Sequence, residues 1–142
     1  MKVKSFFLFV FFLTAASILQ TAVYAQTHNK KKSKLLVLWT SGDRDIALKV
    51  CFMYTHAAAK QKWFDQVRLV VWGPSSRLLA NDAELQQKIK AMKKDGVELF
   101  ACVACANSYG VSDKLRGLGI TVIGMGKPLT EMLKSGWTTL TF

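Results

Sequence analysis

The chain of 142 residues has few of the residues on which most metal and redox centres depend. It contains three cysteines, two histidines and two prolines. A tetrahedral zinc site needs four ligands, and the single C-x-x-C pair has no second pair to complete it. Thioredoxin-like proteins carry a proline that leads into a strand opposite the active site, whereas Pro74 and Pro128 follow strand-like segments. We therefore expect no metal site and no thioredoxin-like fold.

Acidic residues are also scarce, at 9 against 20 Lys and Arg, which gives a net charge of +11. A basic surface can meet nucleic acid, anionic lipid or small anions, but no aromatic-basic RNA-recognition motif accompanies the lysines, and we expect no nucleic-acid partner. Residues 124–127, GMGK, lack the spacing of a Walker motif. Asp43 and Asp45 are interpreted as helix caps and His56 as a core residue. No acid–base pair is evident, and no cofactor is expected.

The N-terminal apolar run, FFLFVFFLTAA at 6–16, is too short to span a bilayer comfortably. Two lysines precede it, and VYA at 23–25 is typical of a cleavage site, so we predict a signal peptide over 1–25 and export to the periplasm. Its removal takes away Lys2 and Lys4 and lowers the charge from +11 to +9. The following residues, 26–34, are predicted to form a basic flexible tail. The alternative is an uncleaved N-terminal anchor.

Over residues 35–142, apolar runs typical of buried strands alternate with segments of helical periodicity. The predicted strands are 35–40, 67–73, 97–103, 120–125 and 137–142. The predicted helices are 46–61, 82–94, 112–119 and 128–136, with a turn or short helix at 74–82. This alternation indicates one α/β domain, a three-layer α/β/α sandwich with a mainly parallel sheet of about five strands.

Binding sites in parallel sheets lie outside the carboxyl ends of the strands. Four predicted loops should therefore meet at one edge, with the sequences TSGD, GPSS, CVACANS and GMGK. One of them carries the cysteine pair. The predicted ligand-binding residues on these loops are Thr40, Ser41, Gly73, Asn107 and Gly126.

Cys102 and Cys105 lie where the third strand ends and a helical turn begins. Backbone N–H groups at a helix start favour an anion, so we expect a lowered thiol pKa and a nucleophilic thiolate. No cation lies in this stretch, so cationic help would come from Arg44 or Lys127 on neighbouring loops. Cys51 is expected to be a buried, inert side chain of the first helix. Two interpretations of the pair stay open. It is structural, as two partly buried thiols or a disulfide, or it is a nucleophile that carries sulfur or another soft group.

Three stretches resemble the DsrE/DsrF-like family, which includes TusD-type sulfur-relay subunits and YchN-like proteins. They are LLVLWTSGD at the start of the domain, LFACVACANSYGV with a cysteine a few residues before Gly110, and LTEMLKSGWTTLTF with Gly-Trp before the last strand. The resemblance implies an α/β/α sandwich that assembles into homo- or hetero-oligomers, often with trimeric units. In the relay members, a cysteine in this loop accepts sulfane sulfur as a persulfide. Cys102 best matches the relay position, and Cys105 lies near the YchN-like position.

We therefore expect an exported carrier or accessory protein that handles sulfane sulfur or thiol redox equivalents through Cys102 and Cys105, rather than a turnover enzyme. Its partners would be a sulfur donor or acceptor protein and further copies of itself, with membrane contact only if the N-terminal segment stays uncleaved. Two neighbouring thiols also allow a persulfide on one to be displaced by the other, which leaves redox exchange or sulfur release open. The alternative is a non-catalytic module that binds a small anion or a partner protein, with a structural cysteine pair.

Overall fold

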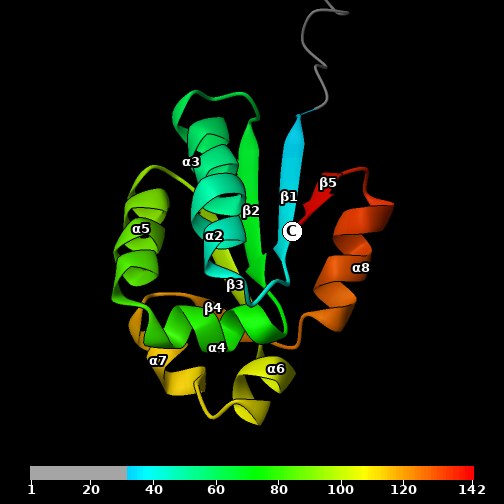
Figure 1. The fold of residues 1–142 in the computed structure, drawn as a ribbon. Coiled ribbons are helices and arrows are strands. Elements are labelled where there is room, and N and C mark those ends of the chain that lie inside the picture. Colours follow the sequence, from blue (N-terminus) through cyan, green and yellow to red (C-terminus); the bar gives the residue numbers. More distant parts are fainter. Residues whose placement is uncertain (1–31) are drawn as a thin grey trace, which may run out of the picture. The chain divides into compact units, whose positions relative to one another are not determined.

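A computed structural model describes residues 32–142, which form one α/β unit. Its sheet has five strands in the order β4-β3-β2-β1-β5, and every neighbouring pair is parallel (Figure 1). The strands are β1 (Lys34–Trp39), β2 (Gln66–Val71), β3 (Glu98–Cys102), β4 (Thr121–Ile123) and β5 (Thr138–Thr141). The predicted fold class and number of strands are confirmed, although β4 is half the predicted length.

Helical segments connect the strands, and they lie on both sides of the sheet: α3 and α5 on one face and α8 on the other (Figure 1). The predicted helix 46–61 is a continuous run that starts earlier and contains a π-helical turn, η1. The helical turn predicted to begin at the cysteine pair is a short helix, α6. The segments are α2 (Arg44–Ile46), η1 (Ala47–Cys51), α3 (Phe52–Lys60), α4 (Pro74–Asn81), α5 (Ala83–Lys94), α6 (Val103–Ser108), α7 (Ser112–Gly117) and α8 (Gly126–Lys134).

The strands bury side chains on both faces of the sheet, which explains their nearly continuous apolar sequences. In β1, Leu35, Val37 and Trp39 belong to the larger core beneath α3 and α5. The next residue along, Leu36, faces the opposite way and belongs to a smaller cluster. That cluster contains Leu36, Val70, Cys102, Met125, Met132 and Trp137. Cys102 therefore lies on the face of the sheet that carries α8.

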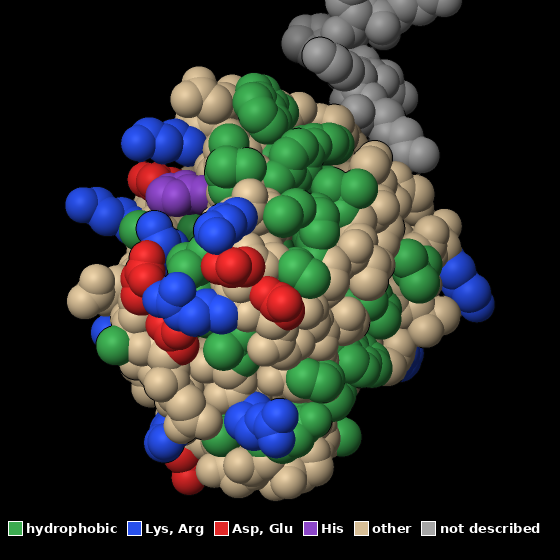
Figure 2. Space-filling model, in the orientation of Figure 1, with side chains coloured by type: hydrophobic (Ala, Val, Ile, Leu, Met, Phe, Trp, Pro, Cys, Tyr) green, Lys and Arg blue, Asp and Glu red, His purple; other side chains and the backbone are tan. Residues whose placement is uncertain are grey.

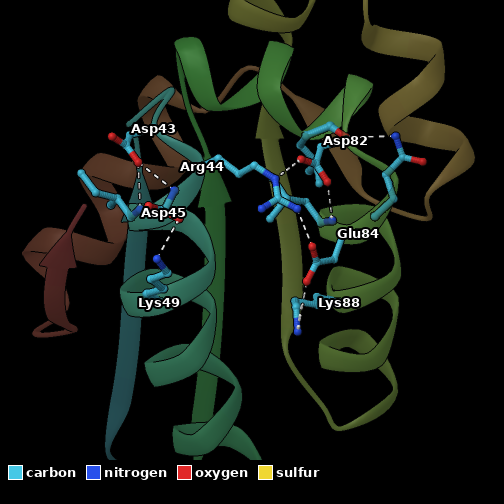
Figure 3. Close-up of polar contacts among 11 residues, drawn as sticks. Asp43, Arg44, Asp45, Lys49, Asp82, Glu84 and Lys88 are labelled. Carbon is cyan, nitrogen blue, oxygen red and sulfur yellow. Dashed lines mark hydrogen bonds and ion pairs between the residues drawn. The ribbon is translucent and has the colours of Figure 1, made fainter.

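The start of the first helix is capped by one of the two predicted aspartates. Asp43 Oδ1 accepts hydrogen bonds from the N–H groups of Asp45, at 2.7 Å, and Ile46, at 3.0 Å, as an N-cap side chain should (Figure 3). Asp45 does not cap the helix. Its carboxylate instead lies 3.1 Å from the ammonium group of Lys49, one turn along. The prediction is therefore confirmed for Asp43 and wrong for Asp45.

The predicted signal peptide over 1–25 and most of the predicted tail lie outside the described residues. The last part of the tail prediction is wrong, because Lys34 is the first residue of β1. Ser33 is also held in place, with its N–H and hydroxyl donating to Asp65 Oδ2 at 2.7 and 2.9 Å. Within residues 32–142, no helix has the length and apolar character needed to cross a bilayer.

Candidate functional site

Of the four loops predicted to meet at the carboxyl edge of the sheet, those after β1, β2 and β3 are joined by hydrogen bonds, and the fourth contributes Met125 to the cluster that contains Cys102. The N–H of Trp72 donates to the carbonyl of Trp39 at 2.9 Å, and the hydroxyl of Ser75 donates to the same carbonyl at 2.6 Å. These bonds join the first two loops. The N–H of Gly73 in turn donates to the sulfur of Cys105, which joins the second loop to the third. The cysteine pair is therefore held by bonds from a neighbouring loop as well as by its own segment.

The two cysteines occupy the N-cap and third positions of α6. Cys102 ends β3 and is the N-cap residue, and Cys105 is the third helical residue. Side chains at these two positions reach toward one another, which is the geometry that the capping box exploits. Cys105 packs against the apolar cluster that contains Cys102. Both are free thiols in the structure, as is Cys51.

The two thiols differ in their access to solvent. Cys102 is 6% exposed and packs among apolar and thioether side chains, including those of Met125 and Met132. Cys105 is only partly buried and lies against this cluster from outside. The sequence did not predict these neighbours of Cys102, because α8 follows β3 by more than twenty residues and no local pattern links them.

Burial raises the pKa of the Cys105 thiol, and the neighbouring Cys102 adds to this rise. The hydrogen bond from the Gly73 N–H acts in the opposite direction, because it stabilises the thiolate. The balance is a raised pKa, so the expected lowering is wrong for Cys105. The rise in pKa that burial of the Cys105 sulfur causes is larger than the lowering that the Gly73 N–H causes.

Gly73 shapes the loop that reaches Cys105. Its backbone has φ +70° and ψ −136°, a conformation that side chains with a Cβ rarely adopt. An added Cβ would meet nothing within 4 Å, so the conformation alone requires glycine here. Pro74 follows as the first residue of α4, where its missing N–H costs nothing. Gly73 is the predicted ligand-binding residue that the structure places against the cysteine pair.

Thr40 and Ser41 use their hydrogen-bond donors to hold the end of the sheet. The N–H and the hydroxyl of Thr40 donate to the carbonyl of Phe142 at 2.7 and 2.9 Å, and the N–H of Ser41 donates to it at 3.1 Å. The hydroxyl of Ser41 accepts from the N–H of Asp43 at 3.0 Å. These contacts give both residues a structural role, and their role in ligand binding stays a prediction.

Asn107 and Gly126 make local contacts in which neither cysteine takes part. Asn107 Oδ1 accepts a 2.5 Å hydrogen bond from the hydroxyl of Ser112, which ties α6 to the start of α7. Gly126 is the first residue of α8, and its carbonyl accepts from the hydroxyl of Thr130 at 2.9 Å. Their predicted part in ligand binding likewise stays a prediction.

The predicted cationic help for the thiols is not supplied by Arg44. Its Nε donates to Asp82 Oδ2 at 2.7 Å, and its Nη2 bonds to Glu84, so it links the first helix to the start of α5 (Figure 3). These hydrogen bonds, that of Asp82 first, raise the pKa of the Arg44 guanidinium. Lys127 has a side chain that is 87% exposed and lies 3.9 Å from Glu131. The prediction is thus wrong for Arg44, whose donors serve two carboxylates.

His56 is a partly buried residue, with a side chain that is 31% exposed, rather than the predicted core residue. Its Nε2 lies 2.6 Å from Asp95 Oδ2, which connects α3 to the end of α5. The hydrogen bond from His56 lowers the pKa of Asp95. Among residues 32–142, no three His, Cys, Asp or Glu side chains come together as metal ligands.

The comparison with known families identifies the group to which this site belongs. The profile of the DsrE/DsrF-like family matches residues 32–142, which is the whole described unit with its cysteine loop. The chain belongs to the DsrE/DsrF-like family. This family is associated in general with sulfur relay. No curated protein matches the chain.

Two solved structures resemble this DsrE/DsrF-like chain. A conserved protein of unknown function from Bacteroides thetaiotaomicron, BT1422, is 35% identical, with a TM-score of 0.77 over 80% of this chain and 100% of that chain. The YchN protein from E. coli is 18% identical, with a TM-score of 0.61 over 78% of this chain and 99% of that chain. The likeness to YchN supports the fold alone.

Proposed function

We propose that this DsrE/DsrF-like chain is a small exported carrier or accessory protein that takes up sulfane sulfur through Cys102 and Cys105. One observation carries the proposal. A partly exposed thiol, Cys105, accepts a hydrogen bond from the Gly73 N–H and lies beside a second thiol at the edge where the loops meet. Such a site needs a nucleophilic sulfur and shelter from solvent, and it needs no general acid–base pair.

The uptake step is a thiol exchange with a hydropersulfide donor, R–S–SH. The Cys105 thiolate attacks the outer sulfur of the donor, so a sulfur–sulfur bond forms on the protein while the donor's own sulfur–sulfur bond breaks. The donor leaves as a thiolate and takes the proton that Cys105 released. Since burial raises the pKa of Cys105, uptake accelerates with pH, and the Gly73 N–H favours the reactive thiolate.

Loading with a persulfide donor tests the proposal. The reduced protein is incubated with a hydropersulfide, and the added sulfur is located by mass spectrometry of its peptides. We expect the added sulfur, or the disulfide that its release leaves, at the 102–105 pair and not at Cys51, which is fully buried. Cys51→Ala, as the matched control, should react like the parent, and Cys102→Ser with Cys105→Ser should not react. If the parent shows neither an adduct nor a Cys102–Cys105 disulfide with released hydrogen sulfide, under conditions that load a known carrier, the proposal is refuted.

Export is supported by the N-terminal sequence, with its basic start, its short apolar run and the VYA ending at Ala25. Expression of the full chain in a bacterium with a periplasm, followed by fractionation and N-terminal sequencing, tests it. We expect periplasmic protein that begins at Gln26. Uncleaved chain in the membrane fraction would instead support the anchor.

Assembly with further copies is supported by an exposed apolar stripe on the first helical run. Ile46, Val50 and Met53 recur at helical spacing, and Met53 is 64% exposed. Figure 2 shows hydrophobic side chains gathered over this part of the molecule. In a two-fold dimer the same surface of both copies packs together, and an uncharged stripe can do so without repulsion between like charges. We expect Met53→Glu to lower the molar mass that light scattering measures in solution. The control Leu133→Glu on α8 should leave this mass unchanged. A parent protein that is monomeric contradicts the assembly.

A further inference from the structure

The two thiols of the site differ in their exposure to solvent and in their hydrogen bonding, and a carrier with one reactive thiol does not require this difference. Cys105 is the more accessible, and it has the Gly73 N–H on its sulfur. Cys102 is 6% exposed, so a bulky donor in solution reaches it poorly. Nevertheless Cys102 and Cys105 hold the N-cap and third positions of α6, and Cys105 packs against the cluster that contains Cys102. Any sulfur that arrives on Cys105 therefore lands next to a second, sheltered nucleophile.

From this arrangement we infer that Cys105 receives the sulfane sulfur and that Cys102 then releases it as hydrogen sulfide. The inference rests on the proposed function, because it takes the persulfide on Cys105 as its starting point. In this inference, the protein reduces one sulfane sulfur for each reduced cysteine pair and does not retain a persulfide as a carrier would.

The release step balances within the pair. The Cys102 thiolate attacks the inner sulfur of Cys105–S–SH, which forms the Cys102–Cys105 disulfide and breaks the bond to the outer sulfur. The outer sulfur leaves as hydrosulfide and takes the proton lost by Cys102, which gives hydrogen sulfide. The sulfane sulfur is reduced by two electrons, and the two thiols are oxidised to the disulfide. A dithiol reductant then restores the pair.

The positions of the two cysteines on α6 favour this attack over retention. The inner sulfur is the original Cys105 sulfur, and Cys105 already packs against the cluster that contains Cys102. N-cap and third-position side chains face one another, so the disulfide closes without unwinding the helix. The wall of Met125, Met132 and Trp137 around Cys102 keeps water and competing donors from the attacking sulfur.

A single-turnover experiment on the full chain tests the division of roles. Reduced protein receives one equivalent of a hydropersulfide without oxygen, and both the hydrogen sulfide released and the oxidation state of each cysteine are measured. We expect close to one hydrogen sulfide per chain together with a Cys102–Cys105 disulfide, and no second release until a dithiol is added. Cys51→Ala should behave like the parent.

The cysteine variants separate the two steps. Cys102→Ser should keep the persulfide on Cys105 and release no hydrogen sulfide, and Cys105→Ser should lose both loading and release. Because a serine hydroxyl at 102 enters an apolar cluster, Cys102→Ala is tested beside it, and circular dichroism reports whether each variant is folded.

The possible failures are distinguishable. A parent protein that holds a stable persulfide on Cys105 with Cys102 still reduced overturns this inference and leaves the proposed function standing. Loading of Cys102 in Cys105→Ser, with release of hydrogen sulfide retained, overturns the assignment of roles. A parent that holds no persulfide, forms no Cys102–Cys105 disulfide and releases no hydrogen sulfide refutes the proposed function itself.

Discussion

The backbone of Gly73 gives the sharpest test of how the site is built. Its φ of +70° and ψ of −136° lie outside the regions open to other residues. We expect Gly73→Ala to lower the free energy of unfolding by about 1–3 kcal/mol, the usual cost of holding a residue with a Cβ in a sparsely populated conformation. Since an added Cβ meets nothing within 4 Å, no steric clash contributes to this cost.

Gly124→Ala is the matched control, because Gly124 follows β4 at the same edge of the sheet. Its Cβ would also enter open space, but its φ is not in the left-handed range. We expect a change of less than about 0.5 kcal/mol there. Urea unfolding followed by circular dichroism measures both variants. If Gly73→Ala unfolds within about 0.5 kcal/mol of Gly124→Ala, the strain argument is refuted.

The same substitution should also alter the thiol. Relaxation of the strained turn moves the Gly73 N–H away from the Cys105 sulfur, which removes the bond that opposes the raised pKa. We expect iodoacetamide to alkylate Cys105 more slowly at about pH 8 in folded Gly73→Ala, with no change in Gly124→Ala. An unchanged rate would mean that the Gly73 N–H contributes nothing to thiolate formation.

Three further predictions concern the rest of the fold. Leu69→Ala in the core of β2 should cost about 2–5 kcal/mol in urea unfolding, against less than about 0.5 kcal/mol for the half-exposed Leu133→Ala; equal losses would contradict the core assignment. Asp82→Ala should cost about 0.5–2 kcal/mol, because Asp82 caps α5. The hydrogen bond from the Leu85 N–H to the Asp82 carboxylate lowers the Asp82 pKa, so the stabilisation by this carboxylate is present above about pH 4 and is lost as the pH falls through the lowered pKa of the folded state. The free energy of unfolding of Asp82→Ala should therefore fall less steeply in acid than that of the parent. An equally steep fall would refute this prediction. Alkylation followed by mass spectrometry should find Cys105 modified first and Cys51 last, because burial raises the pKa of Cys51 to about 12; early modification of Cys51 would contradict its burial.

The layered fold was predictable because strands buried on both faces of a sheet are nearly continuous runs of apolar residues. LLVLW in β1 and VRLVV in β2 stand between segments of helical periodicity, and the alternation alone indicates a parallel sheet. The meeting of the loops at one edge follows from the same topology. Gly73 could be placed there because only Trp72 separates it from the end of β2.

The contacts between distant segments were not predictable. The start of α6 was predicted, but its length was not, because the propensities of its six residues, VACANS, do not separate a helix from a loop. The π-helical turn η1 has the sequence ALKVC, in which no residue distinguishes it from an α-helix. Arg44 pairs with acidic residues about forty positions away, and the cluster around Cys102 draws on β1, β2 and α8, so only the tertiary structure brings these groups together.

The pairing of β5 with β1 sets the order in which the site is completed during folding. The connection between β1 and β2 runs from Thr40 to Asp65, whereas the hydrogen bond from Thr40 after β1 to Phe142 after β5 spans 102 positions. Contacts over such separations form late, because closing the long loop costs entropy before the contact repays it. Both cysteines precede β5 in the chain, so they are synthesised before the first loop of their edge can be fixed. The interval before β5 docks is therefore the period in which these thiols are most open to unwanted oxidation.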